Sequence, residues 1–296
     1  MIVALIFLGL ALIAALAYWE LVVAEGVHLG PRVVIFLYDL ISRRYNSIKQ
    51  FDPTYEDWFL SDPLVSKLRD VHAPLVLDVA TGTGRLPQSL LAQAGFHGQV
   101  IGMDGSRRML AEAARSVQST SGVAERLTLI WQDASHLPFD DDTFDAVTCL
   151  EALEFMPNTR RAICELIRVL RPGGVALLTN RVGPWRKFLP GHTQSPPDFE
   201  TLLGSLGLAQ IKTQTWQVEY DLVWAVKPGS GMSGATQPLP DILRCPRCGG
   251  TLTYGEDTFV CSGTCHRVYR IASDGVIEMM RSDPRPPTTD RRAMRV

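Results

Sequence analysis

The chain has 296 residues, enough for one full-sized domain with additional segments. Its 29 basic and 31 acidic side chains give a net charge of −2, so no overall positive field attracts nucleic acid, and its 46% hydrophobic content is ordinary for a globular protein. The apolar residues are unevenly distributed, because residues 1–19 contain no charged side chain.

Residues 1–24 are predicted to form a transmembrane anchor. A hydrocarbon core of about 30 Å needs about 20 apolar helical residues, and this run meets that length, with Tyr18 and Trp19 as interfacial anchors. A cleaved signal peptide is one alternative, but no Lys or Arg precedes the apolar run. A buried core helix is another, and the lack of any polar face disfavours it.

Residues 25–70 are predicted to form a connector and helical cap. The basic residues near the apolar run all follow it, at Arg32, Arg43 and Arg44. The positive-inside rule therefore predicts a single-pass membrane protein with the rest of the chain on the cytoplasmic side. The apolar stretch from Val33 to Leu40 could lie along the bilayer surface, pack over a ligand or pack on a sheet edge.

Residues 75–84 read LVLDVATGTG and predict a buried strand that ends in an acid and a small-residue turn. Residues 85–94 can form the helix that follows. Gly82 and Gly84 remove side chains where the chain must pass close to a ligand. The spacing is D-x-A-x-G-x-G, which differs from the dinucleotide fingerprint G-x-G-x-x-G.

Further buried runs follow at regular intervals, and they are predicted as strands over residues 100–104, 127–134, 144–151 and 175–179. Asp104 ends the second strand, where an acid in a doubly wound sheet can accept hydrogen bonds from both ribose hydroxyls. A helix is predicted to run through 166–174 and to close on Pro172 and a glycine pair. Any single acid of this series is equally well explained as a solvated loop carboxylate.

Taken together, these motifs resemble class I methyltransferases that use S-adenosylmethionine. The resemblance covers about residues 38–227. It is most specific for the quinone C-methyltransferases of menaquinone and ubiquinone synthesis, whose motif often reads D-V-A-x-G-T-G. It implies a Rossmann-like α/β domain over residues 71–227, and Ala80 in place of the first glycine indicates a turn that tolerates a methyl group.

The resemblance also assigns the cofactor residues. The methionine moiety is expected at Asp78, Ala80, Gly82 and Gly84, the ribose at Asp104, the adenine at Asp133 and Ala134, and the other side of the cofactor at Leu150 and Glu151. In this family a short N-terminal helical region with tyrosines covers the site.

The acceptor side is less defined by the sequence. A carbon nucleophile needs a base that removes a proton, and Glu154, His136 and His192 are the candidates, while the catalytic residue stays unknown. Many relatives have a Glu-His pair after the fourth strand, where this chain has Glu154-Phe155. The segment 185–197 occupies the place of a substrate loop, and its large apolar side chains could line a pocket or pack on each other: Trp185, Phe188 and Leu189.

The last third of the chain contains a cysteine cluster. Cys245-x2-Cys248 and Cys261-x3-Cys265 are two close pairs separated by a hairpin-length segment, the signature of a structural zinc ribbon. His266 as the fourth ligand is an alternative, and disulfides are another that a cytoplasmic chain disfavours. The other two cysteines, at 149 and 164, are most simply buried thiols.

Residues 241–280 resemble small zinc-ribbon domains found beside or inside methyltransferases, on the match of Tyr269-Arg270-Ile271 and Asp274-Gly275-Val276 to their Tyr-Pro-Ile and Asp-Gly-Ile endings. With four arginines and five acids, this segment has no basic stripe for nucleic acid, although a protein could dock on it. The Gly, Ser and Pro-rich residues 228–240 predict a flexible linker. Residues 281–296, with five arginines, predict a disordered tail, either solvated or in contact with anionic lipid.

The sequence therefore predicts a membrane-anchored enzyme that transfers a methyl group from S-adenosylmethionine to a small or lipid-soluble acceptor, such as a quinone precursor or a lipid headgroup. One alternative is an RNA or protein methyltransferase that uses the ribbon for docking. The other is a non-catalytic protein that binds the cofactor and recruits a partner.

Overall fold

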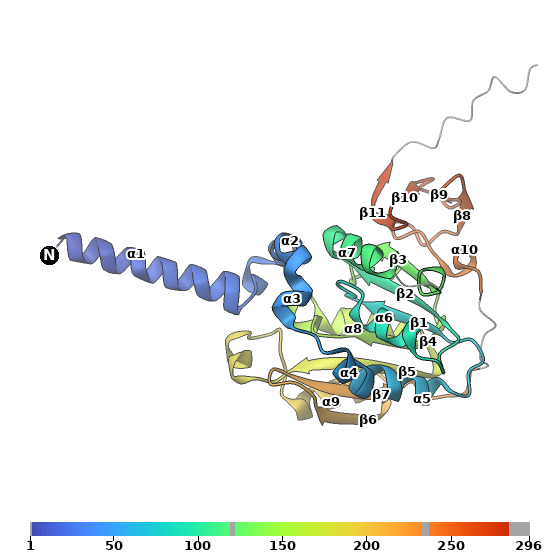
Figure 1. Ribbon diagram of the computed structural model, residues 1–296, viewed down its shortest axis with the longest axis horizontal. Coiled ribbons are helices and arrows are strands. Elements are labelled where there is room, and N and C mark those ends of the chain that lie inside the picture. The colour runs from blue at the N-terminus through green and yellow to red at the C-terminus, as the bar shows by residue number, and fades with distance from the viewer. Residues whose placement is uncertain (1, 119–121, 232–236, 284–296) are drawn as a thin grey trace, which may run out of the picture.

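The computed structural model describes residues 2–118, 122–231 and 237–283 (Figure 1). Residues 232–236 of the predicted linker and residues 284–296 of the predicted tail lie outside the described part of the chain.

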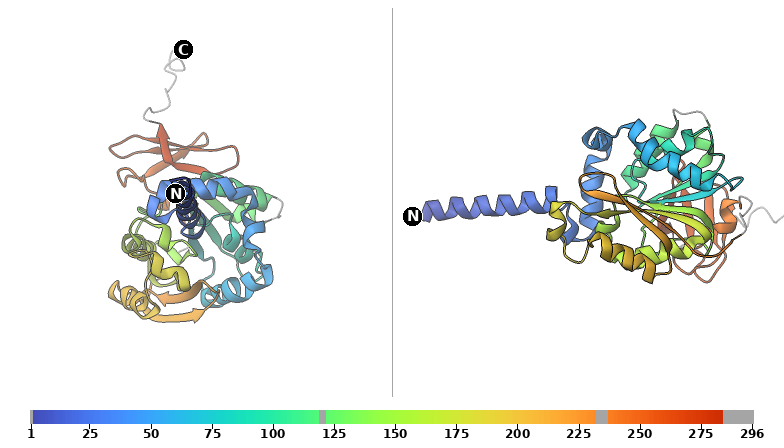
Figure 2. Two further views of the ribbon diagram at one scale, coloured as in Figure 1. Left: turned by 90° about the vertical axis from the view of Figure 1, so that its left-hand side faces the viewer. Right: turned by 90° about the horizontal axis from the view of Figure 1, so that it is seen from below.

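The N-terminal helix projects from one end of the folded domain. Helix α1 (Ile2–Tyr18) continues into η1 (Trp19–Val23), and the right-hand view of Figure 2 shows it standing clear of the rest. The span Ile2–Val23 has 22 residues and is long and apolar enough to cross a membrane, and no residue of α1 is buried. At 1.5 Å per residue it is about 33 Å long.

Short helices connect this span to the sheet. They are η2 (Val27–Leu29), α2 (Pro31–Ile41), η3 (Ser42–Arg44), α3 (Tyr45–Lys49), α4 (Pro53–Glu56), η4 (Asp57–Ser61) and α5 (Asp62–Leu68). Helix α2 begins with Pro31, whose missing N–H is tolerated at a first helical position. Helix α4 is capped by Asp52, whose carboxylate accepts from the Thr54 N–H at 2.9 Å.

The core of the molecule is a largely parallel sheet. Its strands are β1 (Leu75–Val79), β2 (Gln99–Asp104), β3 (Leu127–Trp131), β4 (Phe144–Cys149), β5 (Leu170–Arg181), β6 (Ala209–Thr215) and β7 (Tyr220–Val226). They are ordered β6-β7-β5-β4-β1-β2-β3, and among these strands only β7 is reversed, so that it runs antiparallel to both of its neighbours, β5 and β6. The order reverses beside β1, so β1 and β4 end at the switch point, where ligands of open α/β sheets bind.

Helices pack on both faces of this sheet: α6 (Arg85–Ala92), α7 (Arg107–Gln118), η5 (Ala124–Arg126), η6 (Leu153–Phe155), α8 (Thr159–Val169) and α9 (Pro196–Ser205). The short turn η7 (Pro184–Phe188) follows β5 and lies beside Trp19 at the base of the N-terminal helix. Strand β1 shows the layering. Its Leu75 and Leu77 join a core that includes Ile163 of α8, while Val76 joins the opposite core with Leu90 of α6. This architecture confirms the predicted Rossmann-like α/β fold.

One predicted boundary is wrong. The helix expected to run through residue 174 ends at Val169, and β5 begins at Leu170, which pairs with Phe144. The reason is Pro172, which disfavours helical backbone at the residue before it and cannot donate within a helix. Gly173, at φ 80°, then supplies the left-handed bend.

The C-terminal strands extend the same sheet. After α10 (Leu239–Ile242) come β8 (Leu252–Gly255), β9 (Thr258–Cys261), β10 (Val268–Ile271) and β11 (Ile277–Asp283). Strand β11 pairs in parallel with β3, through Ile277 with Ile130 and Glu278 with Trp131. The sequence predicts a ribbon domain behind a linker, and the structure joins that ribbon to the edge of the main sheet (Figure 1).

Candidate functional site

A cavity of about 570 Å³ opens at the carboxyl ends of the central strands. Seven of the nine predicted cofactor residues line it: Ala80, Gly82, Asp104, Asp133, Ala134, Leu150 and Glu151. Asp78 lines a smaller neighbouring cavity of about 40 Å³, which shares Ala80, Gly82, Leu150 and Glu151 with the larger one. The structure thus brings these residues together from the ends of four strands.

The turn after β1 brings backbone rather than side chains to the cavity. Ala80, Gly82 and Gly84 all have positive φ, at 57°, 58° and 77°. A Cβ built on Gly82 would meet no protein atom within 4 Å, so a side chain there would occupy open space beside the cavity. Gly84 lines neither cavity, and a Cβ on it would lie 3.2 Å from the Cβ of Ala113. Gly84 therefore allows the close packing of α6 on α7.

Asp104 holds this turn and faces the cavity. Its two carboxylate oxygens accept from the N–H of Gly82 at 2.8 Å and of Ser106 at 2.7 Å. Burial raises the pKa of Asp104 to about 6, although these two N–H donors oppose the shift. Since a carboxylate offers about four acceptor positions, Asp104 keeps capacity for two further donors, as a pair of ribose hydroxyls would require.

Asp78, near the end of β1, is buried. Its Oδ1 accepts from the Thr148 hydroxyl of β4 at 2.5 Å. Burial raises the pKa of Asp78 to about 6 against the opposing effect of that hydrogen bond. An acid with this environment is unlike the solvated loop carboxylate that the sequence alone left open.

A cluster of charges surrounds Glu151 where the two cavities meet. The Glu151 carboxylate accepts from Arg85 at 3.1 Å, from Lys49 at 3.3 Å and from Gln217 at 3.2 Å. Arg85 also pairs with Glu56 at 3.0 Å. Burial alone would raise the pKa of Glu151, but Arg85 and Lys49 outweigh it and hold that pKa below its usual value. The sequence identified Glu151 but neither of its cationic partners.

The outer wall of the cavity comes from segments distant in sequence. Tyr38 and Tyr45 line it from α2 and α3, and Met280 lines it from β11. Most other side chains on this wall are apolar, among them Val34, Ile35, Met109, Phe155 and Met156. The Ser106 hydroxyl donates to Asp39 Oδ1 at 2.5 Å and so ties α2 to the end of β2. Helices α2 and α3 thus supply part of the wall of this cavity.

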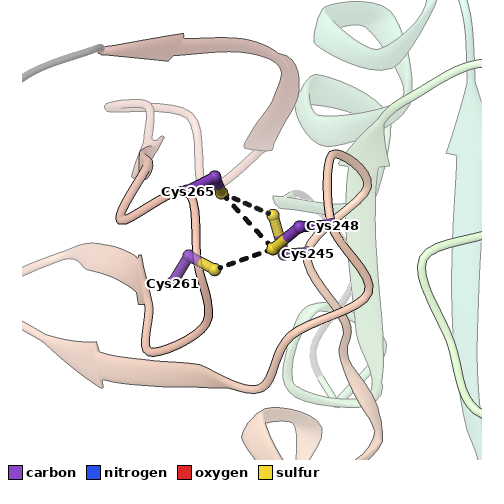
Figure 3. Close-up of side chains that lie close together, drawn as sticks. All are labelled: Cys245, Cys248, Cys261 and Cys265. Atoms are coloured by element: carbon purple, nitrogen blue, oxygen red, sulfur yellow. Dashed lines mark hydrogen bonds between the residues drawn. The ribbon is translucent and has the colours of Figure 1, made fainter.

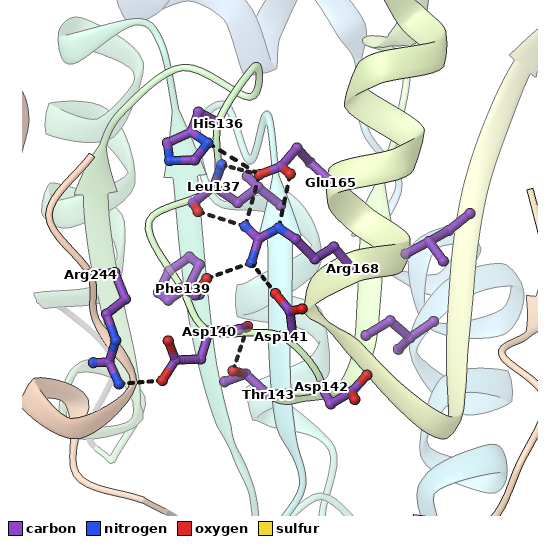
Figure 4. Close-up of polar contacts among 12 residues, drawn as sticks. His136, Leu137, Phe139, Asp140, Asp141, Asp142, Thr143, Glu165, Arg168 and Arg244 are labelled. Carbon is purple, nitrogen blue, oxygen red and sulfur yellow. Dashed lines mark hydrogen bonds and ion pairs between the residues drawn. The ribbon is translucent and has the colours of Figure 1, made fainter. Parts of the chain in front are cut away.

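The three candidate bases lie away from the cavity wall. Glu154 is buried and accepts from the Tyr220 hydroxyl, and His192 Nδ1 lies 2.8 Å from the Glu154 carbonyl oxygen. His136 is exposed, 3.7 Å from Glu165 (Figure 4). None of the three is among the residues that line the cavity in the described part of the chain.

The loop after β3 carries the predicted adenine residues and is held from two sides. Arg168 of α8 donates to the carbonyl oxygens of Leu137 and Phe139, at 2.9 and 2.7 Å (Figure 4). On the other side, Arg244 of the C-terminal segment pairs with Asp140. The loop that carries Asp133 and Ala134 is therefore held both by α8 and by the segment that precedes β8.

The large apolar residues of the predicted substrate loop lie outside the cavity wall. Phe188 packs on Trp19 with ring centroids 6.3 Å apart, and Leu189 is buried with Ala24 and Val27. Phe188 and Leu189 therefore pack against the base of the N-terminal helix.

The four ribbon cysteines converge on one point (Figure 3). Their sulfur atoms all lie within 4.8 Å of one another, and the pairs Cys245–Cys265 and Cys248–Cys261 are each 3.4 Å apart. Tetrahedral zinc at about 2.3 Å from each sulfur needs separations of about 3.8 Å. The donor set therefore fits a zinc ion with no disulfide, and His266 is not needed as a ligand.

Comparison with known proteins locates the fold among known families. A family described as "Methyltransferase domain" matches residues 76–174. The chain is 34% identical to a demethylmenaquinone methyltransferase of Symbiobacterium thermophilum and 32% identical to a ubiquinone/menaquinone biosynthesis C-methyltransferase UbiE of Desulfotalea psychrophila. Each match covers 52% of this chain, and the chain spans 61% and 60% of the length of these relatives.

Two solved structures share the fold at low identity. The [4+2]-cyclase SpnF matches with a TM-score of 0.57 at 20% identity, over 68% of this chain and 97% of that one. A chain from the complex of the Haloferax volcanii Trm112 methyltransferase activator with a putative methyltransferase matches with a TM-score of 0.51 at 19% identity, over 66% and 97%. Since one neighbour is a cyclase, the fold by itself does not assign methyl transfer. Residues 76–174 therefore match a methyltransferase domain, and the chain has the Rossmann-like α/β fold of class I methyltransferases.

Proposed function

We propose that this chain is a membrane-anchored S-adenosylmethionine-dependent methyltransferase whose acceptor is a lipid-soluble molecule such as a quinone precursor. The observation that carries the proposal is the composition of one cavity. Its inner wall contains the acids and glycine turn that would hold the cofactor, and its outer wall is mostly apolar, with Arg32 and Arg161 as charged exceptions. Part of that outer wall is α2, the helix that follows the candidate membrane span.

When bound, the cofactor supplies a methyl group on a positively charged sulfur. The chain's own residues bind and orient it: Asp104 accepts from the ribose hydroxyls, the loop at Asp133 and Ala134 contacts the adenine, and the turn at Gly82 lets the methionine part approach the backbone. The apolar outer wall excludes water from the reacting groups. A methyl transfer of this kind depends mainly on alignment, so it does not require a nucleophilic side chain.

The choice of acceptor rests on the cavity wall and on the relatives. Two matched relatives are named as quinone methyltransferases, and each is at least 32% identical over the matched region. Val34, Ile35 and Met280 would contact an apolar acceptor without leaving buried polar groups unpaired. The headgroup of a membrane lipid is the other lipid-soluble acceptor that we propose.

The C-terminal cysteines are proposed to bind a structural zinc ion. Four thiolate ligands leave no open coordination position, so the ion would stabilise the ribbon and take no part in methyl transfer. Because the flanking basic residues Arg32, Arg43 and Arg44 follow the candidate span, we propose that the domain lies on the cytoplasmic side.

The test uses S-adenosylmethionine labelled on its methyl group. The full chain is reconstituted in vesicles with an extract of the native host, and the lipid, RNA and protein fractions are then separated. Label in the lipid fraction that disappears with Asp104→Ala supports the proposal, and chromatography of that fraction distinguishes quinones from headgroup lipids. Label in RNA or protein, or cofactor binding without any transfer, would replace it with a macromolecular methyltransferase or a non-catalytic protein.

A further inference from the structure

A short turn beside the base of the N-terminal helix has the composition of a membrane contact. It is η7 (Pro184–Phe188), with the sequence PWRKF. Phe188 lies 6.3 Å from Trp19 and 5.9 Å from Trp185 between ring centroids, so three aromatic rings are contiguous across two segments of the chain. Leu189 anchors the turn by packing in a buried cluster with Ala24 and Val27.

The outer side of this turn is exposed. Trp185 is 44% exposed and Phe188 is 42% exposed, although both are large and apolar. Arg186 and Lys187 lie between them, and Lys187 Nζ is 5.2 Å from the centroid of the Phe188 ring. Aromatic side chains with adjacent basic side chains favour the headgroup layer, where the rings meet the acyl boundary and the cations meet anionic phosphates.

The N-terminal helix fixes where a bilayer would lie relative to this turn. The candidate span ends at Val23, and Trp19 is within its last turn. A helix of about 33 Å just spans a hydrocarbon core of about 30 Å. Trp19 would therefore lie at the interface, and the rings of Phe188 and Trp185 would lie at the same depth.

Helix α2 extends the same end of the molecule. Figure 2 shows α2 lying across the base of the N-terminal helix in the right-hand view, with the segment around residues 184–192 beside that base. Phe36 and Leu40 on α2 are exposed, whereas Val34 is buried and lines the cavity. One side of α2 thus faces the cavity, and the other presents apolar side chains outward at the end from which the span emerges.

We propose that residues 184–188 form a second membrane contact, in which Trp185 and Phe188 enter the interface and Arg186 and Lys187 bind anionic lipid headgroups of the bilayer that the N-terminal helix spans. The inference rests on the membrane anchoring in the proposed function. It adds a fixed orientation, in which α2 and the cavity behind it lie against the bilayer surface. A lipid-soluble acceptor would then reach the cavity along α2 without crossing bulk water.

The test measures fluorescence quenching of tryptophan by brominated phosphatidylcholine in vesicles that hold the full chain, without added cofactor or acceptor. Trp185→Phe should remove a strongly quenched component of the emission. The matched control is Trp58→Phe, because Trp58 is 71% exposed on η4, away from the span, and should contribute an unquenched component. If Trp185→Phe leaves the quenched fraction unchanged, residues 184–188 do not touch lipid and the proposal is wrong.

A second variant separates the charge from the rings. In Arg186→Gln/Lys187→Gln, quenching of Trp185 should lose its dependence on added phosphatidylglycerol. The control Arg69→Gln/Lys212→Gln, with the same charge change at exposed positions elsewhere, should keep that dependence. Resistance of the chain to alkaline extraction is measured in parallel. If alkali extracts the unaltered chain from the vesicles, the membrane anchoring itself is wrong. If the chain resists extraction but Trp185 does not contact lipid, only this inference is wrong.

Discussion

On its inner side the central cavity is walled by residues at the ends of adjacent strands, whereas its cover comes from α2, α3 and β11, which are far apart in the sequence. Asp78 and Asp104 on the inner side are held by hydrogen bonds from neighbouring strands or turns. The cover is held by a few ties, such as Ser106 to Asp39 and the pairing of β11 with β3. The inner wall is therefore determined by the sheet, while the cover depends on how separate segments dock.

The largest expected effect comes from disrupting the proposed zinc site of the ribbon, whose strand β11 forms part of the cover. Chelation, or Cys248→Ser, should release the ribbon and lower the thermal midpoint of the whole chain by roughly 10 °C, if about 3 kcal/mol is lost. Calorimetry measures the midpoint. Cys164→Ser is the control, because Cys164 is outside the cysteine cluster. The prediction of a buried thiol is wrong for Cys164, which is exposed on α8, whereas Cys149 of β4 is buried as predicted. A ribbon that melts separately, with the main transition unmoved, would show that the cover does not depend on it.

On the inner side, Asp104→Ala should weaken S-adenosylmethionine binding about 100-fold, since two hydrogen bonds to a charged acceptor are lost at roughly 1.5 kcal/mol each. Titration calorimetry gives the dissociation constant. Asp133→Ala is the comparison, and it should cost less because Asp133 is exposed. Unchanged affinity in Asp104→Ala would remove the ribose assignment.

Cofactor affinity should also fall in acid. Burial raises the pKa of Asp104 and Asp78 to about 6 in the free protein, and a protonated Asp104 cannot accept from both ribose hydroxyls. Affinity should be constant above pH 7 and should fall about tenfold per pH unit below 6. The folding stability of the free protein should have the opposite pH dependence. Because these acids bind protons more tightly when folded, their contribution to stability increases as the pH falls from about 6 towards 4. An affinity that stays constant down to pH 5 would contradict the assignment.

A smaller effect is expected on the cover side from Arg107→Ala. Arg107 pairs with Asp274 at 2.8 Å and with Glu278 at 2.9 Å, and so joins α7 to the ribbon. All three side chains are partly buried, and we expect a loss of about 1 kcal/mol in the free energy of unfolding. Arg115→Ala on the same helix is the control, because its pair with Glu112 is more exposed and should contribute close to zero. Equal effects in denaturant titrations would show that the ribbon contact adds nothing.

The smallest expected change is a gain. Ala80 holds a positive φ of 57°, which costs a non-glycine residue about 1 kcal/mol. Ala80→Gly should relieve that strain, but glycine also makes the unfolded chain more flexible, which favours unfolding. The two effects partly cancel, so we expect the free energy of unfolding to rise by about 0.5 kcal/mol or less. Denaturant titration measures it. The Ala80 methyl group packs against the core, so a large destabilisation would mean that this contact contributes more free energy than the backbone strain costs.

The sequence was sufficient for the inner wall and not for the cover. Asp78, Asp104, Leu150 and Glu151 each follow a buried run, so their convergence follows from parallel pairing of those runs. Lys49, Arg85 and Met280 give no such signal, because their place at the site depends on the docking of distant segments. The sequence predicted the cysteine cluster from its spacing. It could not predict that β11 pairs with β3, since an exposed strand edge carries no pattern for its partner.

By covering the edge of β3, strand β11 also prevents that edge from pairing with a strand of another molecule. Ile277 and Ile130 are separated by roughly 150 residues, so closing this contact is entropically slow compared with pairing among nearby strands. Until it forms, β3 is an open edge with unpaired N–H and C=O groups that can template a strand from another molecule. If the ribbon folds only with the proposed zinc ion, a shortage of zinc would prolong that state, and the chain should aggregate through β3 before it loses the rest of its sheet.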